Sequence, residues 1–113
     1  MDIAIFGAKS IALGVYYAVS TLYAEYNVKA FFVSSNMGNP ENLAGLPVLE
    51  SATYMNKDIC VLIAVPENIH PEIIEILEKQ GFHNYICIDS KKEAFLMEQY
   101  FDKAGKFASI HML

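Results

Sequence analysis

The sequence contains no arginine, and its eight lysines are outnumbered by 13 acidic residues, which gives a net charge of −5. Nucleic-acid binding depends largely on cationic contacts to phosphates, and this chain has the opposite charge balance. The lack of arginine also leaves no guanidinium to bind the 2′-phosphate of NADP. We therefore expect no nucleic-acid partner.

Cysteine is scarce as well. Cys60 and Cys87 are the two cysteines, and each lies inside a short apolar run with no metal-ligating residue at a useful spacing. This pattern is typical of core thiols in a reduced compartment. The sequence therefore predicts no metal site.

Long apolar segments and targeting signals are missing too. The longest uncharged stretch, between Lys9 and Glu25, contains serine, threonine and tyrosine and is shorter than the ~20 apolar residues that a membrane span needs. The N-terminus has no basic segment of the kind that begins a secretory signal. We expect a cytoplasmic protein without a membrane span.

The motifs that carry nucleophilic catalysis are also absent. The sequence has no Gly-x-Ser-x-Gly elbow, no phosphate-binding Walker pattern and no cysteine with a plausible neighbouring base. We therefore predict no catalytic residue and no enzymatic activity for this chain alone.

What the sequence does contain is an alternation of strand and helix patterns. Its 113 residues are 54% hydrophobic, enough for one compact domain. Short apolar runs at 3–6, 28–33, 60–65 and 85–88 alternate with helical patterns at 11–26, 71–80 and 91–104, and a brief extended piece at 45–49 leads into a short helix near 51–56. The pattern predicts a three-layer, Rossmann-like α/β fold whose mostly parallel sheet is covered by helices on both faces. We assign this domain to residues 1–105, and residues 106–113 to a tail or a linker to a partner domain.

Four loops are expected at the carboxyl edge of that sheet, where ligands of open parallel sheets bind. They are residues 7–10, 34–40, 66–70 and the turn with Asp89 and Ser90. In the first loop, Gly7 and Ala8 begin a dinucleotide-binding pattern, but Lys9 occupies the position of its second glycine, which lets the backbone approach a pyrophosphate.

The second loop departs from the dinucleotide pattern as well. Ser34 and Ser35 stand where an acidic residue would bind the ribose of NAD. NAD or NADP binding is therefore disfavoured, while the free N–H groups of the following helix, the Ser10 hydroxyl and the Lys9 ammonium suit another phosphate or a carboxylate. A plain turn that binds nothing is the alternative interpretation of the first loop.

Two further features have a functional and a structural interpretation. His70 precedes Pro71 at a strand-to-helix turn, where it would bind a sugar hydroxyl or act as a base, or else merely cap the helix or lie in solvent. The helix expected at 11–26 is apolar or aromatic around most of its circumference, which includes Tyr16 and Tyr17. We expect a homo-oligomer or interdomain contact there, with surface tyrosines as the alternative.

Several loops together resemble the Rossmann-like N-terminal domains of bacterial surface-polysaccharide proteins. They are similar to the nucleotide-sugar-binding domain of sialic-acid and bacillosamine-type sugar acyltransferases. The similarity covers about residues 3–90 and rests on residues 3–7, Val33-Ser34-Ser35 with Asn39-Pro40, residues 43–49, Leu62-Ile63-Ala64-Val65-Pro66 and His70-Pro71-Glu72-Ile73. In two places the sequence departs from that family: Lys9 stands where glycine is common, and Ser35 where aspartate is common.

The resemblance implies a ligand and a set of contacts. The first loop, with Gly7, Ala8, Lys9 and Ser10, would meet phosphate or sugar, and Lys9 and Ser10 would hold the phosphate. The loop at 34–40, which begins with Ser34, would flank the nucleotide, and Ser35 and Asn36 would touch the nucleoside. The loop from Pro66 to His70 would face the ligand, with His70 at the sugar. It also implies that acyl transfer would need a partner domain.

The interpretation that we favour from sequence is a non-catalytic module that binds a nucleotide-sugar or related phosphorylated ligand in bacterial cell-surface polysaccharide biosynthesis. The alternatives are a structural or oligomerisation domain with a degenerate cleft, and an NAD- or coenzyme-A-binding regulatory domain.

Overall fold

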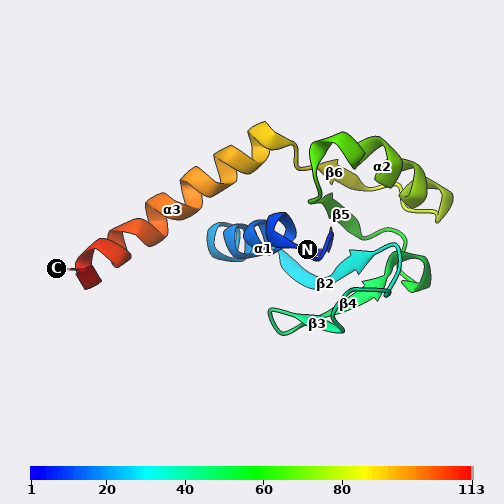
Figure 1. Cartoon of the computed structure of the whole chain (residues 1–113), viewed down its shortest axis with the longest axis horizontal. Helices are drawn as coiled ribbons and strands as arrows, with labels where there is room; N and C mark the ends of the chain where they lie inside the picture. The colour runs from blue at the N-terminus through cyan, green and yellow to red at the C-terminus, as the bar shows by residue number, and fades with distance from the viewer. Residues whose placement is uncertain (113) are drawn as a thin grey trace.

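The computed structural model describes the backbone of residues 1–112 and the side chains of residues 1–103. A six-stranded sheet forms the middle of the molecule, with the strand order β3-β4-β2-β1-β5-β6 (Figure 1). All neighbouring strands are parallel except β3 and β4, which form an antiparallel pair. In chain order the elements are β1 (Asp2–Phe6), α1 (Ser10–Leu22), β2 (Asn27–Val33), β3 (Asn42–Leu43), β4 (Leu46–Glu50), the 3₁₀ turn η1 (Ser51–Thr53), β5 (Cys60–Ile63), the 3₁₀ turn η2 (Glu67–Ile69), α2 (His70–Lys79), β6 (Tyr85–Cys87) and α3 (Ser90–Met112).

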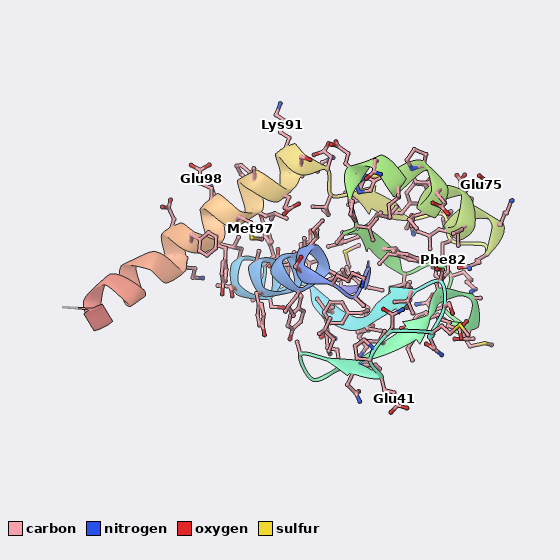
Figure 2. All side chains as sticks on the ribbon, in the orientation of Figure 1. Glu41, Glu75, Phe82, Lys91, Met97 and Glu98 are labelled. Carbon is pink, nitrogen blue, oxygen red and sulfur yellow. The ribbon has the colours of Figure 1, made fainter. Side chains whose placement is uncertain are left out.

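Helices cover both faces of the sheet, as the sequence predicts. On one face, Ile5, Phe31 and Leu62 form a core cluster with residues of α1 and α3. On the other face, Phe6, Phe32 and Ile63 pack with residues of α2, and Phe82 lies on this side (Figure 2). Because successive strand residues point to opposite faces, strands covered on both sides read as unbroken apolar runs. The three-layer α/β architecture is therefore confirmed.

The boundaries of two helices differ from the prediction. The first helix ends at Leu22 rather than near residue 26, because the Tyr23 backbone leaves the helical region and Tyr26 N–H bonds to the Tyr23 carbonyl in a tight turn. This turn lets Asn27 N–H reach the Met1 carbonyl at 2.8 Å and start β2 beside β1. The last helix begins at Ser90 and continues through Gly105 to Met112, so glycine does not stop it. A glycine inside a helix costs only about 1 kcal/mol.

Smaller elements were predicted less well. The short helix expected near 51–56 is the single turn η1, because Asn56 forms the next turn, with its side chain accepting from Asp58 N–H at 3.1 Å. Strand β3 was not expected. It pairs with β4 through a turn in which Ala44 (φ 52°) and Gly45 (φ 79°) both have positive φ, the conformation of a tight hairpin.

The apolar circumference of α1 is partly explained by packing within the chain. Helix α3 crosses over α1, and Met97 lies between the two helices, whereas Lys91 and Glu98 point away (Figure 2). A Cβ atom built on Gly14 would lie 3.6 Å from the Met97 side chain, and the Lys103 ammonium donates to the Thr21 carbonyl at 3.2 Å. Helix α1 is therefore covered on two sides, by the sheet and by α3.

The sequence predicts core thiols at Cys60 and Cys87, and it predicts no membrane span. Cys60 and Cys87 are free and half-buried, and burial raises the pKa of the Cys60 thiol. Among the described residues, no helix is both long and apolar enough to cross a membrane.

Candidate functional site

A cleft of about 450 Å³ opens at the carboxyl edge of the sheet. Its floor is formed where β1, β2 and β5 end, and the turn into α1 and the start of α2 form its sides. The lining is mostly apolar and consists of Phe6, Gly7, Ala8, Lys9, Ser10, Ile11, Val33, Ser34, Asn39, Ala64, Val65, Pro66, Ile69 and Ile73. This is the place where open parallel sheets bind ligands.

Gly7 shapes the bottom of the cleft. Its φ of +132° is in a region that L side chains rarely adopt, and a Cβ atom there would lie 2.6 Å from the Ala64 carbonyl oxygen. Its N–H donates to the Phe32 carbonyl at 2.8 Å. Only glycine lets β1 turn into α1 while β1, β2 and β5 remain this close together.

The amino end of α1 faces the cleft with its first-turn N–H groups available. Lys9 is the N-cap residue, its backbone is extended, and no side chain of the described residues caps the helix. The first turn itself, which is fully described, contains no acidic residue. Since the first N–H groups of a helix have no intrahelical acceptor and carry partial positive charge, this end suits an anion.

The loop that follows β2 is held in place by its own side chains and by β4. Asn36 donates to the Glu50 carboxylate at 3.0 Å, and the Ser35 hydroxyl accepts from Met37 N–H at 3.2 Å. The Asn39 side-chain amide donates to the Ser35 carbonyl at 2.8 Å. These bonds place Asn39 in the cleft wall, a role that the sequence analysis missed.

Six of the nine predicted site residues line the cleft together: Gly7, Ala8, Lys9, Ser10, Ser34 and Pro66. The other three, Ser35, Asn36 and His70, are not part of its lining. Ser35 and Asn36 fix the loop as described above. His70 is only 6% exposed, and its Nε2 lies 2.8 Å from the Val65 carbonyl oxygen, so it joins the start of α2 to the loop that follows β5.

The fourth predicted loop, which carries Asp89 and Ser90, does not line the cleft either. The Ser90 hydroxyl donates to Glu67 at 3.0 Å, and Asp89 accepts from Lys92 N–H at 2.8 Å. The bond from Lys92 N–H holds the pKa of the Asp89 carboxyl below its ordinary value, and the nearby Lys92 charge acts in the same direction. Asp89 therefore serves as the cap of α3.

The charge of the cleft is opposite to that of the chain. Among the described residues, Lys9 is the one charged side chain of its lining, and the lining includes no carboxylate, although the chain carries a net charge of −5. Within the part of the chain that the structure describes, no group of three or more His, Cys, Asp or Glu side chains is placed to hold a metal ion. The arrangement suits a ligand with a phosphate at the amino end of α1 and an apolar group against the floor of the cleft.

No protein-family model matches this sequence, and no curated protein matches it. Solved structures show the similarity instead. The chain is similar to the crystal structure of RSP, a Rex-family repressor, with a TM-score of 0.58 and 12% identity over 96% of this chain and 62% of that one. It is also similar to RSP in complex with β-NADH, with a TM-score of 0.55 and 12% identity over 96% of this chain and 63% of that one.

These comparisons establish a Rossmann-like fold. The chain spans less than two thirds of the length of either structure. Neither match is a surface-polysaccharide protein, so the comparisons give no support to the resemblance drawn from the loop sequences.

Proposed function

We propose that this chain is a non-catalytic Rossmann-like module that binds a nucleotide in the cleft at the carboxyl edge of the sheet. The observation that carries the proposal is the meeting of the uncapped α1 terminus, Lys9 and Ser10 in a cleft whose described lining holds no carboxylate. The similarity of fold to RSP, which has been solved in complex with β-NADH, supports a nucleotide as the ligand class.

Within that class we favour a nucleotide-sugar or a related phosphorylated ligand over NAD or NADP. Lys9 occupies the position at which a glycine would let a pyrophosphate approach the backbone, and Ser34 follows β2 where an acid would bind the ribose of NAD. A role in bacterial surface-polysaccharide biosynthesis rests on the loop resemblance alone.

A thermal-shift screen tests the proposal directly. The purified chain is heated with UDP-, GDP-, CDP- and dTDP-sugars, and with NAD and coenzyme A. A ligand that binds the native state raises its melting temperature by mass action. We expect a selective rise with one nucleotide class. No rise with any of them at millimolar concentration would overturn the proposal and favour a structural domain.

The phosphate contact is tested by the substitution Lys9→Ala. Loss of a hydrogen bond to a charged group should weaken the affinity for the responding nucleotide by about ten- to hundredfold, measured by titration calorimetry. Lys29→Ala is the matched control, because it removes the same charge from an exposed position of β2 outside the cleft. Equal affinities for the two variants would contradict the role of Lys9.

A further inference from the structure

The orientation of the Asn39 side chain is fixed by two backbone carbonyls. Its Nδ2 donates to the Ser35 carbonyl at 2.8 Å and to the Met37 carbonyl at 3.4 Å. Its own N–H also bonds to the Asn36 carbonyl at 3.1 Å. Carbonyl oxygens only accept, so the NH₂ end of the amide must face them. The loop therefore determines which end of the amide remains for a ligand.

The end that remains is the oxygen Oδ1. Among the side chains that the structure describes, no donor is assigned to this atom, although Asn39 is half-buried in the cleft wall. Ser34, which directly follows β2, lines the same side of the cleft. The loop that follows β2 thus contributes a neutral acceptor, Asn39 Oδ1, and the Ser34 hydroxyl to the lining of the cleft.

We propose that Asn39 Oδ1 accepts a hydrogen bond from the ribose 2′-hydroxyl of the bound nucleotide and makes the site specific for ribonucleotides with a free 2′-hydroxyl. This inference rests on the proposed function, since it assigns the sugar edge of the same cleft. In dinucleotide-binding folds an acidic side chain after the second strand receives this hydroxyl. Here the loop brings a neutral amide oxygen to the equivalent edge.

The chemistry of the acceptor defines what the edge excludes. A hydroxyl can donate to Oδ1, whereas a 2′-phosphate offers only acceptor oxygens, and Ser34 and Asn39, the residues that this loop contributes to the described lining, carry no charge to balance it. A 2′-deoxyribose has no 2′-hydroxyl to donate to Oδ1. The hydrogen bond to this half-buried oxygen is then not formed, and the affinity falls. The site should therefore discriminate against both kinds of ligand.

The experiment compares ribonucleotides with their 2′-deoxy counterparts on three forms of the protein. The probes are ADP, UDP, GDP and CDP, each paired with the 2′-deoxynucleotide, and affinities are measured by titration calorimetry. The forms are the natural sequence, Asn39→Asp and Asn39→Ala. Both variants lose the amide donors that hold the loop, but only Asn39→Asp keeps an acceptor oxygen at this position.

We expect the natural protein to prefer the ribonucleotide by about tenfold, and Asn39→Asp to keep a smaller preference, because its carboxylate still accepts from the hydroxyl but no longer bonds to the Ser35 and Met37 carbonyls. Asn39→Ala should bind both members of a pair equally, because the acceptor is gone. If nucleotides bind but the natural protein shows no ribose preference, or if Asn39→Ala keeps it, this inference fails and the proposed function stands. If none of the eight probes binds, this inference is overturned, and the thermal-shift screen with nucleotide-sugars decides the proposed function.

Discussion

At the scale of single residues, the cleft depends on a glycine at position 7, where any side chain would collide with the backbone. We expect Gly7→Ala to destabilise the fold by at least about 1–3 kcal/mol, because it combines an unfavourable φ with a contact of 2.6 Å to the Ala64 carbonyl. The free energy of unfolding in urea, followed by circular dichroism, measures the loss.

Gly38→Ala separates the two causes. Gly38 also has a positive φ, +75°, but a Cβ atom there would meet none of the described atoms within 4 Å. Its substitution should cost about 1–2 kcal/mol from the backbone alone. If the two variants lost the same free energy of unfolding, the close contact between Gly7 and the Ala64 carbonyl would be unimportant.

The sequence predicts some site residues better than others, for a physical reason. Gly7, Lys9, Ser10 and Pro66 come directly after buried strands or begin a helix, so their place at the carboxyl edge follows from the topology. Asn39 and His70 lie deeper in their loops, and hydrogen bonds decide their orientation: Asn39 to Ser35, and His70 to Val65. Neither bond is visible in a periodic pattern.

At the scale of elements, Asp89 should make the start of α3 sensitive to acid. The bond from Lys92 N–H lowers the pKa of Asp89 in the folded state. The stabilisation from the Asp89 carboxylate is therefore complete above the pKa that Asp89 has in the unfolded chain. It is lost as the pH falls through the lower pKa that Asp89 has in the folded protein. Asp89→Asn keeps a capping oxygen without a titrating charge, so it should lose less stability between neutral and acidic pH.

Denaturant unfolding at several pH values checks this expectation. Asp102→Asn is the control, because it removes the same charge from an exposed position of the same helix, away from its cap. This variant measures how far the removal of one exposed carboxylate by itself changes the pH dependence of stability. A pH dependence of Asp89→Asn identical to that of the natural protein would show that the charge of Asp89 contributes nothing to stability.

The buried strands were predicted closely, and the helix ends were not. An apolar run covered on both faces is a strong local signal, so β1, β2 and β5 appear almost where the sequence places them. Helix α1 ends where the chain has to turn back so that β2 can start beside β1. Helix α3 is longer than predicted because it continues through Gly105. Neither constraint is local to the residues concerned.

At the scale of the whole molecule, the contact between copies expected along α1 is still a prediction. The structure limits the residues of α1 that could take part in it. Tyr16 packs on Phe31 in the core, whereas Tyr17 is 45% exposed. If this face joins two copies, Tyr17→Lys should halve the molar mass measured by light scattering while leaving the fold intact. The control is Met55→Lys, which places the same charge on a residue that is 92% exposed. A natural protein that is already a monomer would contradict the contact.

The position of β1 in the middle of the sheet has a consequence for the order of folding. β1 is the first strand in the chain, yet it pairs with β2 on one side and on the other with β5, which follows α1, β2, β3 and β4. Parallel pairing requires such long crossovers, and contacts between distant residues slow folding. During synthesis, one edge of β1 therefore stays unpaired until β5 has been made, and the cleft forms only after Ala64 has been added to the chain.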